Sequence, residues 1–393
     1  MIDVCNFAMS MRAKLGRFLA LALSVALVYQ PAMSATTAKA ASKSGSRAGN
    51  KSAASALSSS ASHKATTHKF VGVPTFADSS KDDFTKYDDP IVRAAAVQAL
   101  GRYNGSVVAI DPATGRILTV VNQKLAFSSG FIPCSTIKPT IALAALQEGI
   151  ITRDSMIKVA PRRYMNLTEA MAHSNNIFFE SLGSRMGFDT VSRYAHLLGL
   201  GELAGYSIPE EQAGTVTLEP PKRGGVARMS SFGEGIQMTP LELASLVATL
   251  ANGGTMYYLQ YPRSEDALRD FAPRVKRQLD IGSYVSDIRE GMQAAVLYGT
   301  AKSSYDHEGE QPLGKTGTCS DDGSRLGWFA SYANQENPRI ALVILVRGHA
   351  HKDDGPYAAA IAGRIYHSLK VQNFFAAGRP TVSAPVAAIL PLR

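Results

Sequence analysis

The sequence predicts an α+β fold, in which helices flank an antiparallel sheet and an all-helical lobe is inserted between its strands. Strand-forming segments lie near both ends of the folded part, over 106–121 and over 314–346, and helical patterns fill the stretch between them. The chain has 393 residues, of which 45% are apolar and 19% are charged, as in ordinary globular proteins. This composition excludes a collagen-like or a wholly disordered chain.

Two segments near the start of the folded part predict a hairpin. They are rich in Val, Ile and Leu, and the sequence Asp-Pro-Ala-Thr-Gly at 111–115 between them supplies the Pro and Gly of a turn. The same pattern returns near the end of the chain. The predicted strands are 106–110, 116–121, 314–319, 326–332 and 339–346.

The helices are predicted from apolar periodicity and from their start and stop signals. Thr239 and Glu242 form a capping box around Pro240, and Gly253 and Gly254 follow the end of that helix. Three further helices are predicted at 135–147, 166–186 and 357–369.

The net charge of +9 is concentrated outside the predicted fold. Residues 36–77 contain six lysines and arginines and no acid, and residues 1–35 contribute +2. The remaining residues therefore carry only +1, so the basicity does not indicate a nucleic-acid-binding face.

The N-terminus has the pattern of an export signal. Arg12, Lys14 and Arg17 precede an apolar run at 18–29, and small residues follow up to Ala35. The run is shorter than the ~20 residues of a spanning helix, so residues 1–35 predict a signal peptide cleaved near Ala35. The alternative is an uncleaved membrane anchor. Either interpretation predicts an exported protein of the periplasm or cell envelope.

The rest of the chain divides by composition. Residues 36–87 predict a disordered basic linker rich in Ser and Ala, because they lack the large apolar groups of a core. The linker is either weakly attracted to an anionic wall or membrane surface or has no partner. The folded domain is predicted to span 88–375, with a C-terminal tail at 376–393.

Three short motifs carry nucleophilic and cationic groups in a fixed order. Ser135 and Lys138 are three residues apart, which places a hydroxyl and an amine on one helix face, where a neutral lysine can activate the serine. Ser174 can relay a proton, and Asn176 can hold a substrate amide. In the third motif, Lys315-Thr316-Gly317-Thr318, an ammonium and two hydroxyls can bind a carboxylate, and Gly317 permits close approach of a substrate backbone.

This ordered set resembles the signature S-x-x-K, S-x-[ND] and K-[TS]-G of the penicillin-binding proteins and serine β-lactamases. The likeness extends over about 90–372 and includes segments at 105–118, 133–138, 208–211, 235–240, 251–254 and 299–301. It implies a β-lactamase/transpeptidase-like fold with no cofactor. In contrast, Ser155 and Lys158 repeat the first motif without any such context, and His349 and His351 are interpreted as a solvated loop and not as a metal site.

The resemblance also implies roles for these residues. Ser135 forms an acyl-enzyme with a D-Ala-D-Ala peptide, Lys138 is the acylation base, and Ser174 passes the proton to the departing D-alanine. Lys315, Thr316 and Thr318 bind the terminal carboxylate.

The presumed mature chain retains two cysteines, Cys134 beside the nucleophile and Cys319 after the Lys-Thr-Gly-Thr run. Some serine carbapenem-hydrolysing enzymes have a bridge at the matching positions, and an oxidising compartment permits one. A Cys134–Cys319 disulfide is therefore expected, with two buried thiols as the alternative.

The resulting functional hypothesis is a penicillin-binding serine D,D-transpeptidase or D,D-carboxypeptidase that acts on peptidoglycan stem peptides. β-Lactam antibiotics are then expected to be covalent inhibitors, and no nucleic acid is expected as a partner. The alternatives are a serine β-lactamase and a non-catalytic β-lactam sensor or wall-binding module.

Overall fold

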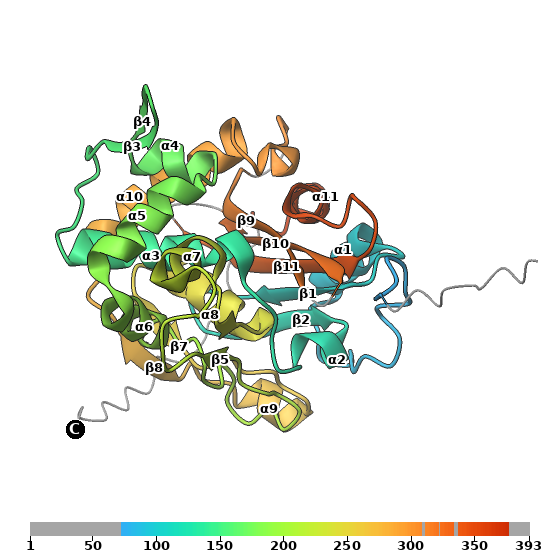
Figure 1. Cartoon of the computed structure of the whole chain (residues 1–393). Coiled ribbons are helices and arrows are strands. Elements are labelled where there is room, and N and C mark those ends of the chain that lie inside the picture. The colour runs from blue at the N-terminus through green and yellow to red at the C-terminus, as the bar shows by residue number, and fades with distance from the viewer. Residues whose placement is uncertain (1–71, 309–310, 322, 334–336, 377–393) are drawn as a thin grey trace, which may run out of the picture. The chain divides into compact units, whose positions relative to one another are not determined.

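A five-stranded antiparallel sheet forms the centre of the computed structural model, which describes residues 72–308, 311–321, 323–333 and 337–376. The strand order is β2–β1–β11–β10–β9, so the first and last strands of the folded chain lie side by side (Figure 1). The predicted antiparallel sheet is confirmed. Its strands are β1 (Gly105–Ile110), β2 (Ile117–Val121), β9 (Pro312–Asp321), β10 (Ser324–Ala333) and β11 (Ile340–Gly348).

Alternate residues of the central strands face two separate cores, as the two-residue period of a strand requires. On one face, Leu342 and Ile344 pack with α1 (Pro90–Leu100) and α11 (Gly355–Val371). On the other face, Val343 and Leu345 pack with the helices of the inserted lobe. Figure 1 shows α1 and α11 beside the sheet, away from the green helices of that lobe.

The inserted lobe is mainly helical and also contains three short antiparallel pairs, β3–β4, β5–β6 and β7–β8. Its elements before α7 are α2 (Gln123–Ala126), the 3₁₀ turn η1 (Cys134–Ile137), α3 (Lys138–Gln147), β3 (Ile157–Ala160), β4 (Arg163–Met165), α4 (Leu167–Ala172), α5 (Asn176–Met186), α6 (Phe188–Leu197) and β5 (Thr215–Val216). The later elements are α7 (Gly225–Phe232), β6 (Ile236–Gln237), α8 (Pro240–Ala251), β7 (Thr255–Tyr257), α9 (Glu265–Arg269), β8 (Val275–Gln278), α10 (Gly282–Leu297) and η2 (Lys302–Ser304).

Helix α8 begins with the predicted capping box. The Thr239 hydroxyl accepts from the Glu242 backbone N–H at 3.0 Å, and the Glu242 carboxylate accepts from the Thr239 N–H at 2.9 Å. The same carboxylate also accepts from the backbone N–H of Gly214 at 2.8 Å. One buried carboxylate therefore caps α8 and fixes a distant loop.

The predicted helix at 166–186 is two helices. Helix α4 ends at Ala172, and α5 begins at Asn176 after the Asn175 side chain accepts from the Phe178 N–H as an N-cap. Ser174 lies between them with φ at +53°, in the left-handed region. Because Asn side chains favour caps over helix interiors, the break is encoded locally.

Residues 72–87, which the sequence assigned to the disordered linker, pack on the domain. The Thr75 and Ser79 side chains are buried, and the backbone at Phe76 pairs with Tyr103. The Thr75 hydroxyl donates to the buried carboxylate of Asp353 at 2.7 Å and accepts from the Ala350 N–H at 3.1 Å. Hydrogen bonds of polar side chains thus attach this segment to the domain. The scarcity of large apolar residues, on which the linker prediction was based, does not reveal such bonds.

The predicted signal peptide at 1–35, the predicted linker up to residue 71 and most of the predicted tail at 376–393 lie outside the described residues. Within the part of the chain that the structure describes, no helix has the length and apolarity needed to cross a bilayer.

Thr75→Val should lower the free energy of unfolding by about 1–3 kcal/mol, because the buried Asp353 carboxylate loses a donor. Urea unfolding at equilibrium measures this, with Thr85→Val as the control, since Thr85 is exposed. Equal stability of the two variants would show that the segment is not held by this contact.

Candidate active site

Three separate segments of the chain bring the predicted site residues together. Ser135 lies in η1 and Lys138 begins α3. Ser174 lies in the turn between α4 and α5, and Asn176 is the first residue of α5. Lys315 lies in β9. All five belong to one connected set of hydrogen bonds centred on the Lys138 amine.

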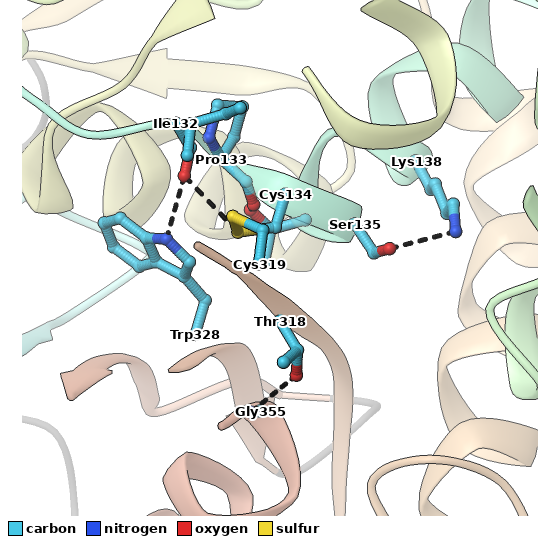
Figure 2. The surroundings of a disulfide bond; sticks show 10 residues. Ile132, Pro133, Cys134, Ser135, Lys138, Thr318, Cys319, Trp328 and Gly355 are labelled. Carbon is cyan, nitrogen blue, oxygen red and sulfur yellow. Dashed lines mark hydrogen bonds between the residues drawn. A yellow bond between two sulfur atoms is a disulfide. The ribbon is translucent and has the colours of Figure 1, made fainter. Parts of the chain in front are cut away.

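The first motif forms one turn. Lys138 Nζ lies 3.0 Å from Ser135 Oγ, as the three-residue spacing predicts (Figure 2). Both side chains are buried, with Ser135 8% exposed and Lys138 fully enclosed. The Thr136 hydroxyl donates to the Pro133 carbonyl at 2.6 Å and fixes the start of the turn.

The Lys138 amine is surrounded by four oxygens. Besides Ser135 Oγ, these are the Ser174 carbonyl at 2.7 Å, Ser174 Oγ at 3.0 Å and Asn176 Oδ1 at 2.7 Å. The carbonyl and the amide oxygen can only accept. A neutral amine has two N–H donors, which these two oxygens satisfy, so its lone pair is left to face the two hydroxyls.

The environment of Lys138 favours this neutral form. Burial lowers the pKa of Lys138 well below the ordinary value of lysine, and the positive charge of Lys315 lowers that pKa further. The carboxylate of Glu180 acts in the opposite direction and is a smaller influence on this pKa. The amine also lies over the Phe179 ring, 5.4 Å from its centroid.

Ser174 connects the two lysines. Its Oγ is 3.0 Å from Lys138 Nζ and 2.8 Å from Lys315 Nζ, which also donates to the Thr316 carbonyl at 3.0 Å. Burial lowers the pKa of Lys315 to about 7. One hydroxyl therefore joins both amines, in a geometry that lets a proton pass between them.

The Lys-Thr-Gly-Thr segment lies on β9, where Lys315 and Gly317 face the side opposite to Thr316 and Thr318. The Thr316 hydroxyl is 2.6 Å from the Thr300 hydroxyl. Thr318 Oγ1 accepts from the Gly355 N–H at 2.8 Å, which leaves the Thr318 proton for another acceptor.

Gly317 allows β9 to approach η1 closely. A Cβ at this position would lie 3.0 Å from the Pro133 carbonyl oxygen and 3.1 Å from Thr136 Cγ2. The structure therefore adds a packing role to the substrate-approach role expected from the sequence.

Several neighbours of the site were not identified as such from the sequence. They include Thr300 and the two residues of α5 next to Lys138, Phe179 and Glu180. The sequence signal for Phe179 and Glu180 is their spacing of three and four residues from Asn176, which places them on the same side of α5. Thr300 lies in the segment 299–301, which belongs to the family likeness.

A disulfide joins Cys134 to Cys319, with a Cα–Cα distance of 5.7 Å (Figure 2). It connects the turn that carries Ser135 to the strand that carries Lys315. Beside it, Trp328 Nε1 donates to the Ile132 carbonyl at 3.1 Å. The turn that carries Ser135 and strand β9 are thus held together by a covalent bond and by packing.

Cys134 has φ at +52°, a backbone conformation that glycine adopts without strain and other residues rarely occupy. Because the disulfide requires a cysteine at position 134, a non-glycine residue adopts this conformation immediately before Ser135.

His349 and His351 lie exposed in the loop after β11. Among the described residues, no group of three or more His, Cys, Asp or Glu side chains is placed to hold a metal. The expected absence of a metal and of a cofactor stays a prediction.

Removing the disulfide should reveal the backbone strain at residue 134. Both Cys134→Ser/Cys319→Ser and Cys134→Gly/Cys319→Ser should lose about 2–5 kcal/mol of unfolding free energy in urea titrations. The glycine version should be the more stable by about 1 kcal/mol, because glycine tolerates the positive φ. A serine version equal to or more stable than the glycine version would argue against a strained position 134.

Comparison with known proteins assigns the family. The sequence model of the family described as penicillin binding protein transpeptidase domain matches residues 105–367. Penicillin-binding protein 2A of Bacillus subtilis (strain 168) is 26% identical over 317 residues, which cover 61% of this chain and 43% of that protein. Peptidoglycan D,D-transpeptidase FtsI of Escherichia coli (strain K12) is 25% identical over 319 residues, which cover 68% and 52%. The chain spans about half the length of the curated relatives it matches.

A solved structure has the same fold. The D,D-transpeptidase domain of a peptidoglycan glycosyltransferase from Eggerthella lenta matches with a TM-score of 0.59 and 20% sequence identity, covering 72% of this chain and 82% of that one. The family model matches more than half of the chain and includes all three motifs. The chain therefore belongs to the penicillin-binding protein transpeptidase domain family.

Proposed function

We propose that this protein is a serine D,D-transpeptidase or D,D-carboxypeptidase that acts on D-Ala-D-Ala stem peptides of peptidoglycan. The observation that carries the proposal is the 3.0 Å contact between Ser135 Oγ and the buried amine of Lys138, whose pKa is lowered well below the ordinary value. A serine hydroxyl is a weak nucleophile until a neighbouring base takes its proton, and a neutral lysine is such a base.

In the proposed acylation, Ser135 Oγ attacks the carbonyl carbon of the penultimate D-alanine, and its proton passes to Lys138 Nζ. A new C–O bond forms to Ser135. The C–N bond to the terminal D-alanine then breaks, and its nitrogen receives a proton through Ser174 Oγ, which contacts the Lys138 amine at 3.0 Å. The products are an ester on Ser135 and free D-alanine.

The terminal carboxylate of the substrate is proposed to meet the cationic strand. Lys315 supplies positive charge from one side of β9, and the hydroxyls of Thr316 and Thr318 supply donors from the other side. β9 is the outer strand of the sheet, so the carboxylate is proposed to lie along its edge, between the two sides. The backbone N–H groups of Ser135 and Thr318 are proposed as the oxyanion hole, each donor lowering the barrier by ~3 kcal/mol. Asn176 is proposed to hold a substrate amide through its Nδ2, since its oxygen contacts Lys138.

The second half of the reaction depends on the acceptor. Attack on the ester by an amine of a second stem peptide gives transpeptidation, and attack by water gives carboxypeptidation. The name of FtsI as a peptidoglycan D,D-transpeptidase supports the amine as acceptor. Because the chain spans only about half the length of such relatives, experiment must decide between an amine and water as the acceptor.

The proposed site of action is the cell envelope, reached through the signal sequence at 1–35, with the basic segment at 36–71 drawn to anionic wall or membrane surfaces. β-Lactam antibiotics are proposed as covalent inhibitors, since their acylation uses the same serine and lysine. This proposal is supported by the family match.

Benzylpenicillin should leave a stable adduct on Ser135, which mass spectrometry detects over a time course. Ser135→Ala should abolish the adduct, and Lys138→Met should slow its formation by about 10²–10⁴-fold through loss of the base. Ser155→Ala is the matched control, because Ser155 and Lys158 repeat the motif outside the site.

Each outcome of that time course has a meaning. Rapid release of the adduct would identify a β-lactamase. An adduct that survives Ser135→Ala, or no adduct on the wild-type protein, would reject the proposed nucleophile and favour a binding module.

The acylation rate constant should have a bell-shaped dependence on pH. It rises through the lowered pKa of Lys138, because only the neutral amine accepts a proton. For a substrate with a carboxylate it then falls above a pKa of about 7, as Lys315 loses its charge. Stopped-flow acylation measures both limbs.

Lys315→Arg should move the alkaline limb to higher pH, because a guanidinium stays protonated. A wild-type profile that is flat from about pH 5 to about pH 9 would contradict the proposed protonation states.

A further inference from the structure

A cavity lies on the same face of the sheet as Lys315. It has a volume of about 510 Å³, within the range that holds sugar-sized ligands. Its lining combines two cations with side-chain amides and hydroxyls and, among the described residues, no carboxylate. The lining includes Asn104, Asn122, Lys124, Ser128, Ser129 and Arg347.

The strand register places this cavity close to the catalytic motif. Cys319 of β9 pairs with Leu326 of β10, which pairs with Arg347 of β11. Paired residues project to the same side of a sheet, and neighbouring strands are about 4.8 Å apart, so Arg347 stands about 10 Å from Cys319 in the same row.

A loop makes the second connection. Phe131 lines the cavity, and its ring lies 5.8 Å from the Arg347 guanidinium. Ser135 follows only four residues later. The cavity and the nucleophile are therefore built on opposite ends of one short segment.

Arg347 is held in place without a counter-charge. Its Nε donates to Asn104 Oδ1 at 3.3 Å, and its backbone N–H donates to the Asn104 carbonyl at 2.8 Å. None of the ion pairs among the described residues includes Arg347 or Lys124, and the two terminal nitrogens of Arg347 donate to no described residue. Burial lowers the pKa of Arg347, and no neighbouring carboxylate compensates for it.

We propose that this cavity is an oxyanion-binding site for a carboxylate or phosphate group carried by an extended substrate whose peptide end reaches Ser135. The guanidinium fork of Arg347 suits either group, Lys124 adds charge, and the exposed Ser129 hydroxyl adds a donor. The inference rests on the proposed function, because the substrate must present its peptide end to Ser135 while its anionic group occupies the cavity. Such a substrate carries an anionic group beyond its reactive peptide. It extends recognition from the peptide end to a second point of the polymer.

Isothermal titration calorimetry with small molecules as probes measures binding at the proposed site. N-acetylmuramic acid supplies a carboxylate on a sugar, N-acetylglucosamine is its neutral analogue, and inorganic phosphate supplies the other oxyanion. The wild-type protein should bind at least one of the two anions and not bind N-acetylglucosamine.

Arg347→Gln should weaken anion binding by about tenfold or more, as expected for the loss of a charge-assisted hydrogen bond. Lys124→Gln provides a second variant at an exposed position, with a smaller loss of binding. Arg162→Gln removes an equal charge from the exposed turn between β3 and β4 and should leave anion binding unchanged.

The outcomes separate the two proposals. Preference for N-acetylmuramic acid assigns a glycan carboxylate, and binding of phosphate alone assigns a phosphorylated group. Failure of the wild-type protein to bind either anion, or equal binding by the Arg347→Gln and Arg162→Gln variants, overturns the site. The penicillin adduct on Ser135 is measured in the same samples and reports on the proposed function independently.

Discussion

The site depends on the burial of two lysine amines around one serine hydroxyl. Water would solvate an ammonium and keep it charged, so enclosing Lys138 lowers its pKa, and the nearby charge of Lys315 lowers it further. Burying these amines opposes folding, because each loses solvation that only partial hydrogen bonding replaces. The fold maintains the arrangement because two large apolar cores on either side of the sheet stabilise the elements that carry it.

Close contacts between distant segments fix this arrangement. Gly317 lets β9 approach the turn of Ser135, and the Cys134–Cys319 bridge joins the same two elements. Ser174 adopts a left-handed conformation between two helices, and its hydroxyl thereby reaches both amines. Each of these features depends on backbone geometry as much as on side-chain chemistry. The positions of the site residues are therefore set largely by the turns and close contacts between elements.

The sequence predicted the sheet and the order of the motifs well, because strand composition, capping signals and the spacing of Ser135 and Lys138 are local properties. It placed Ser174 inside a helix, since the cap formed by Asn175 was overlooked within a helical pattern. It also assigned Thr75 to a linker, because the contact with Asp353 joins residues that are far apart in the chain. The neighbourhood of Arg347 was likewise hidden, since strand register is a property of the assembled sheet.

The protonation state of Lys138 is the most direct test of this account. The protein is labelled with ¹³C at the lysine ε carbons, the Lys138 signal is assigned with a Lys138→Arg variant, and its shift is followed against pH by nuclear magnetic resonance. We expect the pKa of Lys138 to lie well below that of an exposed lysine, so that its signal titrates at lower pH than those of the exposed lysines. A Lys138 signal that titrates near the ordinary lysine value of about 10.4 would contradict it.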